Sequence, residues 1–210
     1  MTTQRPIRLL CVDDHRLVRE GLALIVGPHP DIDVVALAGS GEEAVELFRR
    51  HRPDVTLMDL RLPGMSGVEA IRAIRADYPE ARIVVLTMYE GDEDVHRALE
   101  AGAVTYLLKD MVADDLMGAI RDAHDGKKPM HPAIEARLAE RASHPTLTSR
   151  EARIIELMAQ GLRNKEIGAV LGISEATVHV HVRNAFAKLG VHERTAAVRV
   201  ALHRGIIHLP

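Results

Sequence analysis

The stretch Pro53–Gly67, PDVTLMDLRLPGMSG, decides the fold of this chain. Its apolar run at 55–58 is typical of a strand in a parallel sheet that is covered on both faces. The run ends at a carboxylate, Asp59, and a proline-glycine pair soon after it indicates a turn. Ser66, with Glu69 three residues later, forms a capping box that opens a helix. Asp59 is therefore expected at the carboxyl end of a strand, where open α/β sheets bind their ligands.

Four more apolar runs accompany this one and alternate with patterns of helical period. The five strands are expected at residues 7–12, 33–38, 54–58, 83–86 and 104–108. Strands that alternate with helices predict βαβ units, whose sheet is parallel and carries helices on both faces. We therefore expect an α/β fold with a doubly wound five-stranded parallel sheet.

Polar side chains stand where these strands end. Crossovers between parallel strands are right-handed, so the carboxyl ends of all the strands share one edge of the sheet. This geometry brings together five side chains that are far apart in the sequence: Asp13, Asp14, Asp59, Thr87 and Lys109.

The chemistry of this set suits a phosphoryl group. Carboxylates in one pocket repel one another unless a cation holds them, and Mg²⁺ accepts carboxylate oxygens together with phosphate oxygens. Lys109 offers phosphate a positive charge, Thr87 offers a hydroxyl, and a carboxylate such as Asp59 can itself be phosphorylated. Taken singly, the acids could be helix caps, the threonine a strand-end hydroxyl and the lysine a solvated loop charge.

The charge distribution divides the chain. Residues 1–145 hold 18 Lys and Arg against 25 Asp and Glu, whereas residues 146–210 hold 9 against 5. A basic C-terminal part favours nucleic acid as a partner, although ordinary surface solvation gives the same count. The single cysteine, Cys11, excludes an intramolecular disulfide, and no apolar run approaches the ~18 residues of a membrane span. A cytoplasmic protein with no membrane partner is expected.

The C-terminal part carries four short helical patterns. A capping box at Thr148 opens the first, and Asn164 is expected to cap the second over 165–171. Ser174 caps the third, which ends before Gly190. The tight turn LGIS between the second and third helices indicates a helix-turn-helix, whose second member enters the major groove of DNA.

Helical periodicity gives the third helix two faces. The core face consists of Val178, Val182, Ala185 and Leu189. The opposite, slim face consists of Val180, Arg183 and Ala187, with His179 and Asn184 beside it. Arg183 can bind guanine edges, and Val180 can contact a thymine methyl. A solvent-exposed helix face that happens to carry one valine would give the same pattern. Three further cations could contact phosphates or be plain surface charges: Lys165, Lys188 and Arg194.

Residues 5–125 resemble the receiver domain of response regulators, which is flavodoxin-like in fold. The motifs that carry the resemblance are VDDH at 12–15, MDLRLPGMSG at 58–67, LTMYE at 86–90 and YLLKD at 106–110. Receivers often have proline after the motif lysine, frequently with a cis bond. Asp110 stands there in this chain, so a cis bond is not expected, because a non-proline cis peptide costs about 2.5–4 kcal/mol.

The resemblance implies a role for each pocket residue. Asp59 would accept a phosphoryl group from the phosphohistidine of a sensor kinase, and Thr87 and Lys109 would contact the phosphoryl oxygens. Tyr106 matches the aromatic residue whose rotamer follows Thr87. The implied Mg²⁺ ligands are Asp13, Asp14, Asp59 and the backbone carbonyl of Arg61.

Residues 147–207 resemble the DNA-binding domain of the NarL/FixJ and LuxR families. The order LTSRE…GLRNKEIGAVLGISEATVHVHVRNAFAKLGV carries this second resemblance. The family usually has lysine where this chain has His179, and imidazole is mostly uncharged at neutral pH. In the family the last helix, here around 195–202, is a dimer surface, although a core role for its apolar face is equally compatible with the sequence.

These observations predict a two-component response regulator that binds DNA. The expected parts are a receiver at 1–127, a linker at 128–146 with Pro-containing breaks, and a LuxR-type helix-turn-helix domain at 147–210. Its expected partners are promoter DNA, a sensor histidine kinase, a second copy upon phosphorylation, and RNA polymerase as a further candidate.

Two rival functions follow from the same residues. The first is a hydrolase that uses Asp59 as a turnover nucleophile, whereas a receiver catalyses only its own phosphorylation and dephosphorylation. Such hydrolases need a second carboxylate close after the nucleophile to act as acid and base, but Leu-Arg-Leu-Pro follows Asp59. The second rival is a DNA-binding protein whose first domain is a docking module that is never phosphorylated.

Overall fold

The computed structural model describes residues 5–88, 91–109, 113–128 and 130–208. The described residues form two compact units: those up to residue 88 and within 97–134 make up one, and those within 91–96 and from 135 onward make up the other. Among the described residues, no helix is both long enough and apolar enough to cross a membrane. Asp110, where a trans bond is expected, lies outside the described residues.

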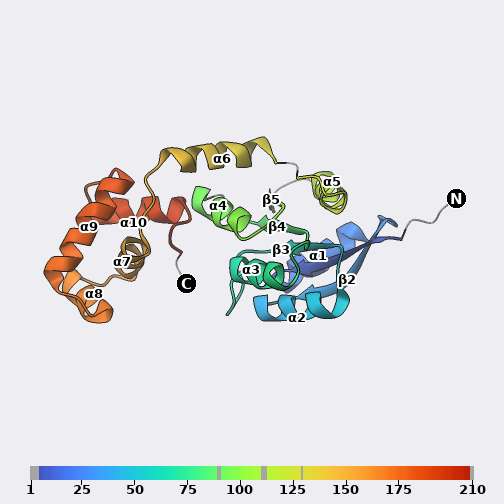
Figure 1. The fold of residues 1–210 in the computed structure, drawn as a ribbon, viewed down its shortest axis with the longest axis horizontal. Helices are drawn as coiled ribbons and strands as arrows, with labels where there is room; N and C mark the ends of the chain where they lie inside the picture. Colours follow the sequence, from blue (N-terminus) through green and yellow to red (C-terminus); the bar gives the residue numbers. More distant parts are fainter. Residues whose placement is uncertain (1–4, 89–90, 110–112, 129, 209–210) are drawn as a thin grey trace. The chain divides into compact units, whose positions relative to one another are not determined.

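The first unit is built on the expected parallel sheet. Its strands are β1 (Ile7–Val12), β2 (Ile32–Ala38), β3 (Val55–Met58), β4 (Ile83–Thr87) and β5 (Thr105–Leu108). They pair in the order β2-β1-β3-β4-β5, and every pairing is parallel (Figure 1). All four residues of β3 are buried, as the apolar run predicts for a strand covered on both faces. The predicted fold class is confirmed.

Helices follow the strands in strict alternation. They are α1 (Arg16–Val26), α2 (Gly41–His51), α3 (Gly67–Asp77), α4 (Asp92–Glu100) and α5 (Ala113–His124). Residues of α1 and α5 pack on one side of the sheet, where Leu22, Val26, Met117 and Ile120 join Leu57 in one apolar core. This core packs against the strands whose carboxyl ends carry the predicted site residues.

The start of α3 is as the sequence predicts and fixes the loop after Asp59. The Ser66 hydroxyl accepts from the Glu69 backbone N–H at 3.3 Å, and the Ser66 N–H donates to the Glu69 carboxylate at 2.9 Å. A Cβ on Gly67 would collide with the backbone carbonyl of Asp59, so only glycine lets the helix begin this close to the strand end.

The helices α7 (Ser149–Ala159), α8 (Asn164–Leu171), α9 (Glu175–Leu189) and α10 (Arg194–His203) surround a small core of their own. The helix α6 (Pro132–Ser143) precedes them in the chain. The capping box at Thr148 and the Ser174 cap are confirmed. Gly172 and Gly190, both with positive φ, end α8 and α9, which form the expected helix-turn-helix.

The start of α8 differs from the prediction by one residue. Arg163 is the N-cap, and its backbone N–H donates to the Glu166 carboxylate at 2.7 Å, so Asn164 already belongs to the helix. The Asn164 amide instead lies 3.3 Å from the ring of His179 on α9. A carboxylate three residues into a helix can satisfy the cap N–H by itself, which leaves the asparagine side chain available for α9.

Candidate functional site

The carboxyl edge of the sheet holds the predicted pocket residues in place by backbone pairing. Asp13 follows β1, and Asp59 follows β3, where its N–H donates to the Val12 carbonyl at 3.0 Å. Thr87 ends β4, and the Lys109 N–H donates to its carbonyl at 2.9 Å. The side chains of Asp13, Asp59 and Thr87 are all buried, so these three groups are largely removed from water.

Lys109 joins two of the acids directly. Its Nζ lies 2.5 Å from Asp13 Oδ2 and 2.6 Å from Asp59 Oδ2. Burial by itself would lower the pKa of Lys109, but its hydrogen bonds and charge interactions with Asp13 and Asp59 raise that pKa above the ordinary lysine value. The ammonium is therefore charged at neutral pH and offsets one of the negative charges in the pocket.

Asp14 stands at the mouth of the pocket, together with a residue that the sequence did not single out. The Asp14 side chain is 36% exposed, and its Oδ1 lies 2.6 Å from Nδ1 of His15. The backbone N–H of His15 also donates to Asp13 Oδ1 at 2.9 Å. Ligand atoms of Asp13, Asp14 and His15 lie close enough together to share one metal ion. The signal for His15 was its position next to the acidic pair.

The remaining predicted residues lie at the end of β4, on β5 and in the loop after β3. The Thr87 hydroxyl is buried and has no hydrogen-bond partner among the residues that the structure describes. Tyr106 on β5 is fully buried. The Arg61 N–H donates to Asp59 Oδ1 at 3.3 Å, which brings the backbone of Arg61 alongside that carboxylate.

The helix α9 presents the two faces that its periodicity predicts. Val178 and Ala185 are fully buried, and Val182 lies partly in the same core. On the other face Val180 is 46% exposed, and Arg183, Ala187 and Asn184 are exposed as well. An exposed valine amid polar side chains is the arrangement that contact with a thymine methyl requires.

Comparison with known proteins assigns both parts of the chain. Residues 9–121 match the response regulator receiver domain, and residues 145–201 match the bacterial regulatory proteins of the luxR family. This chain belongs to the LuxR-type DNA-binding response regulators. The membership groups the regulator with transcription factors rather than with conventional enzymes.

Individual relatives span almost the whole regulator. The transcriptional regulatory protein LiaR of Bacillus subtilis (strain 168) is 40% identical over 206 residues, which is 94% of this chain and 97% of LiaR. The nitrate/nitrite response regulator protein NarP of Escherichia coli (strain K12) is 39% identical over 211 residues, 97% of this chain and 98% of NarP. The crystal structure of the response regulator ChrA, from a heme-sensing two-component system, covers 97% of this chain and all of ChrA, at 36% identity and a TM-score of 0.59.

Two cations of the regulator that could contact DNA phosphates have contacts within the C-terminal unit. Lys188 Nζ lies 2.7 Å from the buried Glu151 carboxylate of the α7 capping box. Arg194 donates to the carbonyls of Met158 and Leu162 at 2.9 Å and 2.5 Å. Lys165 is exposed on α8. A phosphate would have to compete with these partners at Lys188 and Arg194, whereas Lys165 is accessible to one.

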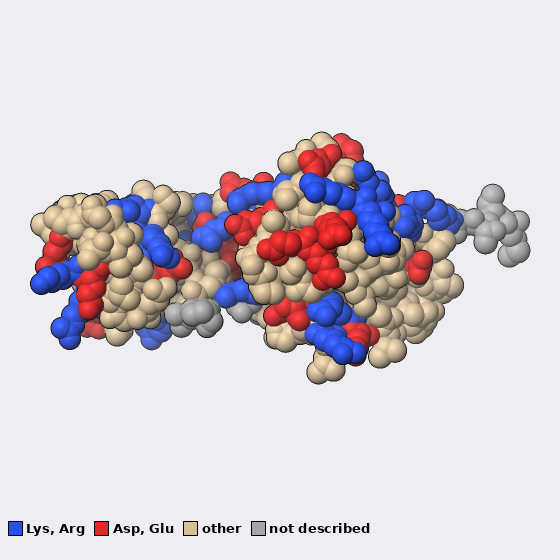
Figure 2. Space-filling view, turned by 90° about the horizontal axis from the view of Figure 1, so that it is seen from below, with Lys and Arg blue, Asp and Glu red and all other residues tan. Residues whose placement is uncertain are grey.

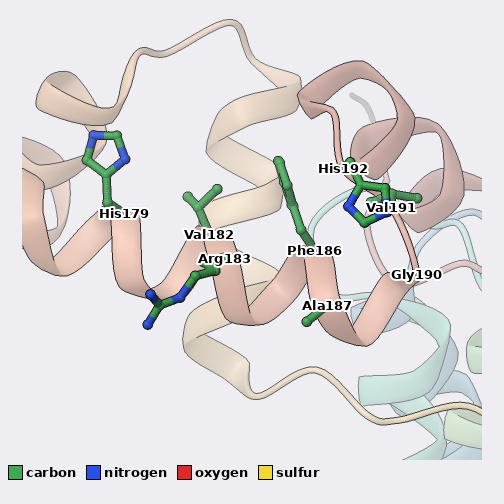
Figure 3. A pocket seen from close by; sticks show the side chains of 8 residues that line it. All are labelled: His179, Val182, Arg183, Phe186, Ala187, Gly190, Val191 and His192. Atoms are coloured by element: carbon green, nitrogen blue, oxygen red, sulfur yellow. The ribbon is translucent and has the colours of Figure 1, made fainter.

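A hollow of about 500 Å³ runs along one side of α9 (Figure 3). His179 lies near one end of it and His192 near the other, with Val182 and Phe186 between them. The complete lining is His179, Val182, Arg183, Phe186, Ala187, Gly190, Val191 and His192. Sequence reasoning missed this groove, because its second wall comes from the loop after α9, which periodicity does not place.

Proposed function

We propose that this regulator is a phosphorylation-dependent switch of transcription. Asp59 accepts a phosphoryl group from the phosphohistidine of a sensor kinase, and α9 contacts promoter DNA. The observation that carries the proposal is the pairing of a buried Asp59 with Lys109 at 2.6 Å, beside a buried Thr87 hydroxyl that has no partner among the described residues. Such a set is costly to bury unless a ligand completes it.

The transfer uses groups that the pocket already holds. A carboxylate oxygen of Asp59 attacks phosphorus, the bond from phosphorus to the donor imidazole breaks, and the bonding electrons leave with the ring nitrogen, which takes up a proton from water. The Lys109 ammonium neutralises charge on the phosphoryl oxygens, and the Thr87 hydroxyl donates a hydrogen bond to one of them. The resulting acyl phosphate is held by the same two side chains.

The residues present also fit a magnesium ion. The acids Asp13, Asp14 and Asp59 outnumber the one ammonium of Lys109, and their oxygens are the hard donors that Mg²⁺ prefers. Asp13, Asp14, Asp59 and the carbonyl of Arg61 would hold the ion. When bound, it would neutralise charge between the phosphoryl donor and Asp59.

We further propose that phosphorylation favours a dimer on DNA. A single helix-turn-helix contacts few base pairs, so two copies on half-sites about one helical turn apart give the usual specificity. Filling the pocket would shift a pre-existing equilibrium toward the conformation that dimerises. The exposed face of α9, with Val180 and Arg183, would then contact base edges in each half-site, and RNA polymerase is a candidate partner of the bound dimer.

The test of the phosphoacceptor is direct labelling. The full chain, Mg²⁺ and a small acyl phosphate should give one acid-stable, base-labile phosphoryl group per chain, detected as an added mass. Asp59→Asn should abolish it. Asp33→Asn, which alters an exposed carboxylate on β2, is the matched control and should be labelled like the wild type. Full labelling of Asp59→Asn would refute the assignment and favour a different acceptor.

A further inference from the structure

The groove beside α9 combines an apolar floor with a rim that can carry positive charge. Val182 and Phe186 form the floor, and His179, Arg183 and His192 stand around it (Figure 3). From His179 to Gly190 the groove follows eleven residues of α9, which is about 16 Å at a rise of ~1.5 Å per residue. A groove of this kind suits an elongated ligand with apolar and anionic parts in alternation.

We propose that this groove seats the sugar-phosphate backbone of one strand of duplex DNA, and that His179 and His192 become ionic phosphate contacts when they are protonated. The inference rests on the proposed binding of DNA by α9. Deoxyribose has an apolar surface that packs against Val182 and Phe186, while the phosphates on either side meet the imidazoles of His179 and His192. The groove lies next to the exposed face of α9, so a helix in the major groove would have this side turned toward one strand.

His179 lies beside polar side chains and is exposed to water. From α8, the Asn164 amide lies 3.3 Å from its Nδ1. From α9 itself, Glu175 lies 3.9 Å from its Nε2, and Arg183 lies one helical turn further along the groove. Its side chain is 64% exposed, so water and phosphate both reach the ring.

His192 stands in the loop after α9. Its ring makes no hydrogen bond or ion pair with any residue that the structure describes, and it is exposed. Arg183 lines the same groove, and Glu193 is the residue directly after His192 in the chain. The imidazole of His192 is therefore accessible to a phosphate of bound DNA.

The consequence is a DNA affinity that rises as the pH falls. Each phosphate neutralised by a protein cation adds about 0.9 to the slope of log K against log salt concentration. Imidazole changes its charge between about pH 5 and pH 8, so each protonated histidine adds one such contact within that range. Two histidines should steepen the slope by up to roughly 1.8 between about pH 8 and about pH 6.

This can be measured with the full chain and a fluorescent duplex of mixed sequence, by anisotropy over a series of salt concentrations. Each series is run near pH 6 and near pH 8, with and without a small acyl phosphate. The variants are His192→Gln, His179→Gln and the double variant. His203→Gln, which removes an exposed histidine on α10 outside the groove, is the control. His192→Lys fixes the charge and tests the position itself.

The expected pattern separates the groove from general effects of pH. The wild type and His203→Gln should show the steeper slope at the lower pH, each single variant should lose about 0.9 of the change, and the double variant should show none. His192→Lys should gain a contact that is present at both pH values. A wild-type slope that does not change with pH, or a double variant that keeps the change, would overturn the inference while leaving DNA binding intact. Failure of the wild type to bind under any of these conditions would overturn DNA binding itself and the groove with it.

Discussion

Replacing Lys109 with methionine would remove the one ammonium between two buried carboxylates while keeping most of the side chain's length. The Nζ lies 2.5 Å from Asp13 and 2.6 Å from Asp59, whose side chains are 2% and 5% exposed. Removing one partner of a buried ion pair costs about 3–5 kcal/mol, because a charge is left buried without compensation. For a chain of this size 1 kcal/mol corresponds to about 2–4 °C, so the melting temperature should fall by roughly 6–20 °C.

The pH dependence of this loss follows from the direction of the lysine pKa. The pKa of Lys109 is raised in the folded state, so its stabilising effect is complete below the ordinary lysine pKa of about 10.4 and is lost only as the pH rises through the folded value. The difference between wild type and Lys109→Met should therefore be constant from neutral to mildly alkaline pH.

Magnesium should reverse the defect. In the wild type a bound Mg²⁺ would share the acids with the Lys109 ammonium, and the two positive charges would repel each other. Movement of the lysine relieves most of this, so a tenfold gain in Mg²⁺ affinity, about 1.4 kcal/mol, is a conservative expectation for Lys109→Met. Titration calorimetry measures the affinity, and far-UV circular dichroism measures the melting temperature with and without Mg²⁺.

The control is Lys127→Met, which removes a 64% exposed lysine paired with Asp122. Because solvent screens this exposed pair, the melting temperature of the variant should stay within a few degrees of wild type and its Mg²⁺ response should be unchanged. An equal loss in the two variants, or an equal gain from Mg²⁺ in Lys109→Met and wild type, would refute the reasoning that Lys109 holds the charge balance of the pocket.

Three further outcomes are expected. Arg183→Ala should cost about 1–3 kcal/mol of DNA binding and relax sequence preference. Lys165→Ala, which removes an exposed lysine on α8, should instead weaken all sequences alike and lower the salt slope by about one. Anisotropy with specific and random duplexes distinguishes the two outcomes. Sedimentation should show a shift from monomer toward dimer when a phosphodonor is added, and an unchanged profile would count against coupling. Met88→Ala should speed loss of the phosphoryl group several-fold without altering Mg²⁺ affinity. The reason is that Met88, 67% exposed, follows Thr87 and can exclude water from the acyl phosphate. Equal half-lives of the phosphorylated wild type and variant would show that Met88 has no such role.

The pocket could be predicted from the sequence because the backbone alone assembles it. Once the apolar runs fix five parallel strands, the right-handed crossovers leave one edge for Asp13, Asp59, Thr87 and Lys109. No knowledge of side-chain packing is needed, because each residue is the last of its strand or follows it directly. The residue numbers at the strand ends therefore carry the information.

The contacts of side chains that have several possible partners could not be predicted in this way. Asn164 has the residue type of a helix cap, yet Glu166 satisfies the cap at Arg163 and the asparagine turns to His179. On α1, Leu17 is 83% exposed although it lies in an apolar pattern of helical spacing, because Leu22 and Val26 face the sheet instead. Periodicity finds the helix, but the packing partner decides which stripe is buried.

The same competition separates the cations of the DNA-binding domain. The Lys188 ammonium pairs with the buried carboxylate of Glu151. Burial by itself would raise the pKa of Glu151, but hydrogen bonds from Lys188 and Thr148 lower this pKa overall. A phosphate can take that lysine only by leaving a buried carboxylate with less compensation, which opposes DNA binding. Arg183 and the two groove histidines have no such buried acid among the contacts described for them, so their charge remains available to a strand of DNA. On the face shown in Figure 2, the Lys and Arg side chains lie spread among acidic side chains. The ionic part of the DNA affinity of this regulator should therefore depend more on the groove of α9 than on the number of Lys and Arg in the domain.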